Sequence, residues 1–303
     1  MFTRRIFTKL LAASTAACAV RPSRLLALDE HPVNDISVMM WTMKKFGTFE
    51  ENLERVAQAG YRCVELVDEF KHWTPEEKQR ILARMKALGI QIDAMAGLTR
   101  GFADPARGFA DPAGASAYIA ELKDLIPVAK ELGCSQIILM SGKRLDSIAA
   151  EAQHRASIET LSQAAPILAA NGITGLIEPI DRIENPPIYL DGVTEAFAIT
   201  NAVSSPSIKV LYDLYHEQRG YGNLIEKLNA NIAQVGLIHV ADVPGRHAPG
   251  TGEIDYPTIY RRLAALKYTG RIAMEFYPND AADIIPSLRR AREDALRALT
   301  SPS

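Results

Sequence analysis

The chain has 303 residues, of which 48% are hydrophobic and 23% are charged, a composition typical of globular proteins. The formal net charge of −2 argues against nucleic acid or anionic lipid as the main partner, because both are bound through a concentrated basic surface. No run of eighteen apolar residues follows the N-terminal segment, so we expect no membrane span in the body of the chain.

The first 27 residues are predicted to be a twin-arginine export signal. Arg4 and Arg5 stand before a short apolar stretch, residues 10–20, which is too short for a membrane helix. A signal of this type predicts that the mature protein is periplasmic or otherwise exported. The twin-arginine export machinery would carry it in the folded state. Two alternatives stay open, which are a lipoprotein signal with its anchor at Cys18 and a disordered basic N-terminus.

Cleavage after Ala27 would leave residues 28–303 as the folded domain. The signal contains five basic residues and no acidic ones, so its removal would change the net charge from −2 to −7. Cys63 and Cys134 would be the remaining cysteines, and we expect both to be buried thiols that form no disulfide.

Strand-like and helix-like segments alternate from residue 36 to the end of the chain. Short apolar or β-branched runs predict eight strands, at 36–40, 63–66, 90–94, 136–140, 174–178, 209–212, 236–240 and 271–275. Helical periodicity follows these runs, for example at 49–59, 75–88, 115–132 and 148–170. Eight alternating units of this kind imply an α/β fold, a single (β/α)8 TIM barrel. An open doubly wound sheet is the alternative, but no glycine-rich nucleotide loop follows the first strand.

The ends of the predicted helices carry matching signals. Thr74 is suited to cap a helix that starts with Pro75 and continues with two acidic residues. Glycine stands just past four predicted helices, where a left-handed conformation is expected, at Gly60, Gly89, Gly133 and Gly172.

A direct duplication follows the third predicted strand, where the pentapeptide Gly-Phe-Ala-Asp-Pro begins at Gly101 and again at Gly108. In a TIM barrel this position lies on the face that holds the active-site loops. The duplication is therefore either a tolerated loop insertion or a lid over the site.

Four consecutive strands place an ionisable residue at their carboxyl ends, namely Glu178, Asp213, His239 and Glu275. In a TIM barrel these ends converge on one face, where catalytic groups are found. Three carboxylates would repel one another there unless a bound cation compensated their negative charge. Oxygen ligands with one imidazole suit Mn2+ or Mg2+, with Co2+, Fe2+ or Zn2+ as alternatives. Separate salt-bridged residues are the other interpretation.

Several segments resemble one enzyme family. They are Asp213 with His216 three residues later, the stretch 176–180, and above all the long stretch 241–256. These motifs are similar to those of the hydroxypyruvate isomerase family, within the xylose-isomerase-like TIM barrels that also include the ketose 3-epimerases. The resemblance covers about residues 36 to 280, nearly the whole predicted barrel.

The resemblance implies metal ligation by the four strand-end residues, with Glu178 and Glu275 also acting as the acid/base pair. It implies that His216 and Arg246 contact substrate oxygens. Hydroxypyruvate isomerases usually carry Gln at the position of His239, whereas ketose 3-epimerases carry His, so this chain departs from the pattern. The export signal is a second departure, because the characterised type of isomerase is cytoplasmic.

The ligand set predicts proton transfer next to a carbonyl through an ene-diolate, with one glutamate removing a proton and the other returning one. The leading interpretation is a hydroxypyruvate-type isomerase of a small hydroxy-oxo acid. The alternatives are an exported keto-sugar epimerase or lyase, and a non-catalytic sugar-binding barrel, against which the intact ligand set argues. A homo-oligomer stays open.

Other residues near the strand ends receive weaker predictions. Trp41 and Met43 follow the first strand and are expected either in an apolar wall of the site or in packing. Glu65 is expected either in the mouth of the barrel or on loop backbone, and Asp242 is expected to support a metal ligand.

Overall fold

The computed structural model describes residues 36–98 and 108–300. The predicted export signal, its cleavage after Ala27 and the anchor at Cys18 lie outside the described residues, as does the first copy of the duplicated pentapeptide. Within the described residues, no helix has the length and apolar character needed to cross a membrane.

Eight parallel strands in the described part of the chain form a closed barrel in sequence order, with β8 paired to β1. They are β1 (Ile36–Met39), β2 (Cys63–Leu66), β3 (Gln91–Met95), β4 (Gln136–Leu139), β5 (Thr174–Ile177), β6 (Ile208–Asp213), β7 (Val235–Val240) and β8 (Arg271–Met274). Each strand overlaps its predicted run and differs from it by at most one residue at either end, so the predicted (β/α)8 barrel is confirmed.

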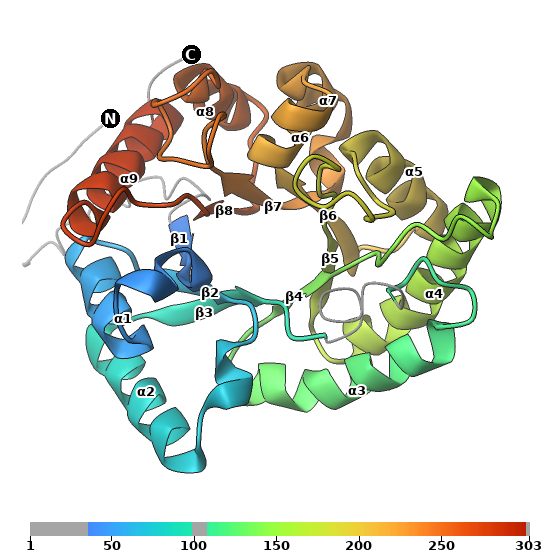
Figure 1. The fold of residues 1–303 in the computed structure, drawn as a ribbon, viewed down its shortest axis with the longest axis horizontal. Helices are drawn as coiled ribbons and strands as arrows, with labels where there is room; N and C mark the ends of the chain where they lie inside the picture. The colour runs from blue at the N-terminus through green and yellow to red at the C-terminus, as the bar shows by residue number, and fades with distance from the viewer. Residues whose placement is uncertain (1–35, 99–107, 301–303) are drawn as a thin grey trace, which may run out of the picture. The chain divides into compact units, whose positions relative to one another are not determined.

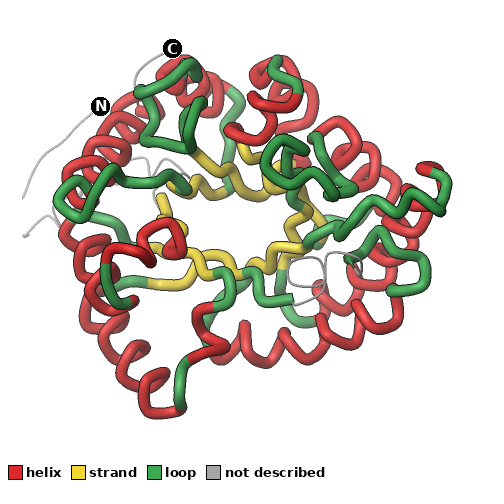
Figure 2. Tube along the Cα trace, in the orientation of Figure 1, coloured by secondary structure: helices red, strands yellow, loops and turns green. Residues whose placement is uncertain are grey.

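Helices surround the strands on the outside of the barrel, as Figures 1 and 2 show. The α-helices are α1 (Phe49–Gln58), α2 (Pro75–Leu88), α3 (Ala115–Glu131), α4 (Ala150–Ala170), α5 (Val193–Val203), α6 (Leu214–Gly220), α7 (Leu224–Asn231), α8 (Tyr256–Ala265) and α9 (Ile284–Thr300). Short 3-10 helices follow β1 and β2 and precede β7, at η1 (Met40–Phe46), η2 (Glu69–His72) and η4 (Ile232–Gln234).

The helix boundaries follow the predicted local chemistry. Thr48 and Thr74 each close a capping box with the glutamate three residues later, which satisfies backbone groups that the first helical turn leaves open. The four predicted helix-ending glycines all have positive φ, between 66° and 93°, so the left-handed conformation is confirmed at Gly60, Gly89, Gly133 and Gly172.

The second copy of the duplicated pentapeptide is packed onto the segment after β4. Phe109 and Ala110 are fully buried, and their amides donate hydrogen bonds to the carbonyls of Met140 and Ser141. A Cβ atom at Gly108 would lie 2.2 Å from the backbone of Ser141, so only glycine fits this approach. This copy is part of the barrel's packed structure, whereas the lid hypothesis concerns residues outside the described ranges.

An apolar cluster contributed by most of the strands fills part of the barrel interior. It contains Met39, Ala94, Ala96, Ile138, Met140, Leu176, Ile188, Leu211, Leu237 and Ala273. Such a cluster supports the site because it holds the strands at fixed spacing beneath the strand ends.

We expect Leu237→Ala to lower the free energy of unfolding by about 2–5 kcal/mol, because the fully buried leucine would leave a cavity. Urea titration of the two proteins would measure the loss. Ile183→Ala is the matched control, because Ile183 is 68% exposed and its truncation should change stability by less than about 0.5 kcal/mol. Equal losses in the two variants would contradict the assignment of Leu237 to the barrel core.

Candidate active site

The closed barrel brings the four predicted ligands together. Glu178 and Glu275 directly follow β5 and β8, Asp213 ends β6, and His239 is the penultimate residue of β7. All four side chains are buried, and one potential ligand atom of each lies within 4.8 Å of the others. Register supports this placement, because Asp213 and His239 are directly paired across β6 and β7.

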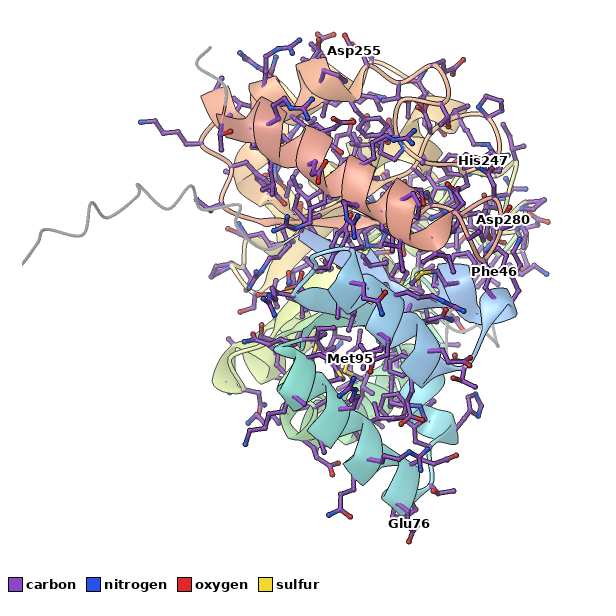
Figure 3. The ribbon with its side chains drawn as sticks, turned by 90° about the vertical axis from the view of Figure 1, so that its left-hand side faces the viewer. Phe46, Glu76, Met95, His247, Asp255 and Asp280 are labelled. Carbon is purple, nitrogen blue, oxygen red and sulfur yellow. The ribbon has the colours of Figure 1, made fainter. Side chains whose placement is uncertain are left out.

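The site lies on the face formed by the loops that follow the strands. Figure 3 labels Phe46, His247 and Asp280, from the segments after β1, β7 and β8, and shows all three on the same side of the barrel. Catalytic groups of TIM barrels lie on this face.

The two carboxylate oxygens of Asp213 have separate functions. Oδ1 accepts hydrogen bonds from the amides of Tyr215 and His216, at 2.8 and 3.2 Å, and so caps α6. Oδ2 is left for the site, where it lies 3.0 Å from Nη2 of Arg246. The helix cap therefore fixes the direction of the oxygen that faces the other ligands.

His239 is oriented by Glu65. Its Nε2 lies 2.8 Å from Oε2 of Glu65, and since a carboxylate only accepts, Nε2 donates. Its Nδ1 faces the site and lies 2.5 Å from Oε2 of Glu275 and 3.8 Å from Oε1 of Glu178. Glu65 was expected either in the mouth of the barrel or on loop backbone, but its side chain lies in the barrel interior, directly beneath the site.

Two of the converging atoms, Nδ1 of His239 and Oε2 of Glu275, are buried and make no hydrogen bond of good geometry, although they lie 2.5 Å apart and Oε2 lies 2.6 Å from Nη2 of Arg246. Several carboxylates in one buried space are costly unless positive charge compensates them. A divalent cation between Nδ1, Oε2 and the carboxylates of Glu178 and Asp213 would do so, with a ligand set suited to such ions. The residues present therefore fit a metal, and their assignment as its ligands stays a prediction.

A second group of potential ligands, Asp181, Glu184 and His216, also comes together nearby. Here the oxygens are already satisfied, because Asp181 accepts from His216 at 2.7 Å and Glu184 accepts from Arg219 and Arg246 at 2.9 and 3.2 Å. Arginine charges take the place that a cation would fill, so this group is suited to positioning rather than to metal binding.

The two site glutamates have opposite pKa shifts. Burial and the nearby charge of Glu275 raise the pKa of Glu178 to about 7. Burial opposes ionisation of Glu275 as well, but Arg246 and His239 outweigh it and lower the pKa of Glu275. Neighbouring carboxyl groups with separated pKa values are suited to different acid and base tasks.

Negative charge surrounds His239. Burial disfavours its protonated form, but the carboxylates of Glu275 and Glu65 outweigh this effect and raise the pKa of the imidazole well above its usual value. The field that attracts a proton to His239 in the metal-free protein would also attract a divalent cation, which would displace that proton.

Arg246 and His216, predicted to contact substrate, are both buried at the site and lie against each other. Nη1 of Arg246 lies 3.0 Å from Nε2 of His216, and Nη2 lies 2.6 Å from Oε2 of Glu275. Nε of Arg246 donates to the backbone oxygen of Glu275 at 3.1 Å. Arg246 therefore compensates the carboxylates, and its contact with substrate stays a prediction.

The loop that delivers Arg246 is held by Asp242. The two oxygens of Asp242 accept from the amides of Val243, Gly250, Gly252 and Ile254, at 2.8 to 3.0 Å. Asp242 was expected to support a metal ligand, but the structure places it in the loop, where its short side chain can satisfy four amides. It acts on the site through the position of Arg246.

Sequence reasoning missed two site residues and one contact of a third. Asp181, which orients His216, follows Glu178 by three residues, and this spacing is a signal that was available. Glu184 has no comparable signal, because it lies in an irregular loop. Trp41, expected either in a wall of the site or in packing, lines the cavity, and its indole N–H also donates to Oε1 of Glu275 at 2.9 Å. Met43 is fully buried in the core, which settles its placement.

A cavity of about 430 Å3 opens at the site. Met39, Trp41 and Ile138 contribute apolar surface to it, beside Glu178 and Glu275. A cavity of this size with a few converging polar groups is suited to a small molecule.

Comparison with known proteins agrees with this geometry. The sequence matches the xylose isomerase-like TIM barrel family over residues 53–299, and the chain belongs to this family. It is similar to hydroxypyruvate isomerase of Escherichia coli K12, with 30% identity over 248 residues that cover 78% of this chain and 92% of that protein. It is 32% identical over 240 residues to 2-oxo-tetronate isomerase of Cupriavidus necator, covering 76% of this chain and 87% of that protein.

Solved structures show the same fold. The crystal structure of an AP endonuclease of family 2 from Brucella melitensis superposes with a TM-score of 0.75 at 25% identity, over 84% of this chain and 96% of that one. D-psicose 3-epimerase from Clostridium cellulolyticum H10 gives a TM-score of 0.69 at 18% identity, over 86% of this chain and 96% of that one. With relatives that are isomerases along most of its length, the chain is an isomerase-type enzyme, and the resemblance to hydroxypyruvate isomerases is confirmed.

The raised pKa of Glu178 predicts a pH dependence of stability in the metal-free protein. The unfolded chain releases this proton near pH 4.5 and the folded chain near pH 7, so the folded state binds more protons between these values. The free energy of unfolding should therefore fall as the pH rises from about 4.5 to about 7.

Urea titrations across this pH range, with metal removed by a chelator, would measure the effect. Glu178→Gln cannot ionise and should lack this part of the pH dependence. If the two proteins change in parallel with pH, the raised pKa of Glu178 is wrong.

Proposed function

We propose that this protein is a metal-dependent isomerase of hydroxypyruvate type, which moves a proton between adjacent carbons of a small hydroxy-oxo acid. The observation that carries the proposal is the convergence of Glu178, Asp213, His239 and Glu275, whose potential ligand atoms lie within 4.8 Å of one another, at a cavity that Glu178 and Glu275 line. The names of the similar proteins supply the reaction class.

The chemistry proposed is a balanced proton transfer. A proton leaves the hydroxymethyl carbon of hydroxypyruvate, an ene-diolate forms, and a proton is returned to the former carbonyl carbon. The hydroxyl proton passes from the hydroxymethyl oxygen, which becomes the aldehyde oxygen, to the former carbonyl oxygen, which gives tartronate semialdehyde. When bound, a divalent cation, with Mn2+ or Mg2+ the best match to the ligands, would supply Lewis-acid stabilisation of the negative charge that develops on the substrate oxygens.

The chain's own groups perform the remaining tasks. Glu178 and Glu275 are the proposed proton-transfer pair, because both carboxyl groups line the cavity and can exchange a proton with the substrate. Trp41 holds one oxygen of Glu275 through its indole N–H. His216 and Arg246 would bind substrate oxygens at the inner end of the cavity, and Met39 and Ile138 would exclude water.

An acidic substrate would need a cationic partner in this cavity, which is also lined by Asp68, Glu69, Glu178, Glu184 and Glu275. Lys44 lines the cavity, is exposed, and follows β1 in η1. Arg246 also lines the cavity, but its charge is shared by three carboxylates, those of Asp213, Glu184 and Glu275. We therefore infer that Lys44 pairs with the substrate carboxylate.

The second candidate is a keto-sugar epimerase or lyase that uses the same site. It is favoured by His239, which stands where hydroxypyruvate isomerases usually carry Gln and ketose 3-epimerases carry His. An NMR time course in D2O separates the candidates. The Mn2+-loaded protein is incubated with hydroxypyruvate or with keto sugars, and Mn2+ is removed from each sample before its spectrum is recorded. Tartronate semialdehyde with deuterium on carbon supports the isomerase. Inertness toward hydroxypyruvate, with exchange or elimination in a keto sugar, supports the second candidate.

Glu178→Gln and Glu275→Gln should each lower kcat by at least about 100-fold, because each removes one member of the proton-transfer pair. Glu253→Gln is the matched control, since Glu253 is an exposed residue of the stretch 241–256 and has no place in the proposed chemistry. Near-normal turnover in both site variants would falsify the acid/base assignment.

Lys44→Met should raise KM for hydroxypyruvate by about 10-fold, equal to about 1.4 kcal/mol, and leave kcat nearly unchanged. The neighbouring Lys45, which lies over the rings of Phe46 and Tyr277, provides the control Lys45→Met. An unchanged KM in Lys44→Met, or an equal increase in both variants, would show that Lys44 does not bind the carboxylate.

Export by the twin-arginine route is part of the proposal. Its support is the pair Arg4 and Arg5 before a short apolar stretch. Replacing both with lysine should keep the full-length precursor in the cytoplasm, as measured by cell fractionation and immunoblotting. Unchanged export of the double variant would rule out this route.

A further inference from the structure

A buried carboxylate lies directly beneath the proposed metal site. The side chain of Glu65, in β2, is fully inaccessible to solvent, and its Oε2 lies 2.8 Å from Nε2 of His239 on the opposite part of the barrel wall, in β7. Burying a carboxylate in a barrel interior is costly, and an apolar residue would fill the space without that cost. The side chain therefore calls for a functional explanation.

The contact with Glu65 determines which imidazole nitrogen faces the site. Because the carboxylate only accepts hydrogen bonds, Nε2 of His239 carries a hydrogen and is turned away from the converging ligands. Nδ1 is the atom that faces the converging ligands, 2.5 Å from Oε2 of Glu275 and 3.8 Å from Oε1 of Glu178. If Nε2 keeps its hydrogen, a bound cation can be held only through Nδ1.

Glu65 is itself held in place from below. Its Oε1 lies 3.2 Å from the hydroxyl of Ser37, which also lies 3.0 Å from Oδ2 of Asp93, so the single hydroxyl hydrogen can be donated to either carboxylate but not to both at once. The other oxygen of Asp93, Oδ1, pairs with Nε of Arg271 at 3.1 Å. Ser37 is fully buried and Asp93 nearly so.

These contacts form a continuous polar column, which consists of Arg271, Asp93, Ser37, Glu65 and His239. It begins at the first residue of β8 and ends at the penultimate residue of β7, so it crosses the interior from the opposite end of the barrel to the site. Five strands, β1, β2, β3, β7 and β8, contribute to it, and none of its contacts depends on a loop. The column therefore places the Glu65 carboxylate rigidly.

We propose that Glu65 is a positioning residue that fixes the orientation and the tautomer of His239, so that Nδ1 is presented to the cation. The inference rests on the metal site of the proposed function. Carboxylate partners of ligating histidines orient the ring, and their loss typically lowers metal affinity by 10- to 100-fold. Neither the sequence motifs nor the comparisons assign this function to Glu65.

The test is metal affinity, measured independently of turnover. Mn2+ binding to the metal-free full chain would be titrated by the loss of the EPR signal of free Mn2+, for wild type, Glu65→Gln and Glu65→Leu. Glu65→Leu should weaken binding by about 10- to 100-fold, and Glu65→Gln, which keeps an acceptor oxygen but not the charge, should show a smaller loss. Glu217→Gln is the matched control, because Glu217 is equally buried and pairs with Lys227 away from the column.

A second readout separates positioning from general loss of structure. In Zn2+-loaded protein with 15N-labelled histidine, long-range proton–nitrogen NMR should show Nδ1 of His239 as the metal-bound nitrogen and Nε2 as protonated. Glu65→Leu should lose this pattern while its circular dichroism stays that of wild type. If Glu65→Leu does not fold, Glu65→Gln and Ser37→Ala carry the test, with smaller losses of Mn2+ affinity expected in both.

The outcomes distinguish this inference from the function on which it rests. Normal Mn2+ binding by wild type that Glu65→Gln and Glu65→Leu leave unchanged, with the same nitrogen pattern, overturns the inference alone. Failure of wild type to bind Mn2+ or Zn2+ overturns the proposed metal-dependent function and the inference with it.

Discussion

The mutual repulsion of three buried carboxylates is the constraint on which the site depends. Glu178, Asp213 and Glu275 are each at most 6% exposed, and barrel closure fixes the strand ends that carry them. They cannot separate to reduce the repulsion, because each is attached to a strand paired on both sides. Positive charge must therefore be brought to them, and the surrounding structure is arranged to supply it.

Two cationic groups reach the carboxylates from the protein. His239 enters from the barrel wall and Arg246 from the loop after β7, where its backbone has a positive φ of 58°. Asp242 holds this loop through four amide hydrogen bonds, and Gly252 allows it to close tightly, since a Cβ there would lie 2.0 Å from the carbonyl oxygen of Val243. The main structural function of the stretch 241–256 is thus to position the guanidinium of Arg246 at the carboxylates.

The fold could be predicted from the sequence because each strand–helix unit has its own local sequence signals. Apolar runs, capping threonines and glycines after helices depend on neighbours a few residues away, and they gave the strand boundaries within one residue. The strand-end residues could be found for the same reason, because the carboxyl ends of consecutive parallel strands lie at the same end of the barrel. What the sequence did not reveal depends on contacts across the barrel: Asp181 with His216, Trp41 with Glu275, and Glu65 with His239 are separated by 35, 234 and 174 residues. No local pattern encodes such pairs.

The burial of Cys63 and Cys134 affects how the folded chain responds to oxidants. Cys63 and Cys134 are buried thiols, as predicted, and burial raises the pKa of Cys134 to about 12. A thiol reacts with oxidants and disulfides mainly as the thiolate, which is suppressed at Cys134 at neutral pH. Nothing in this part of the chain needs an oxidising environment to mature or a reducing one to survive. A barrel that folds in one redox compartment can therefore work in another without any change in its covalent structure.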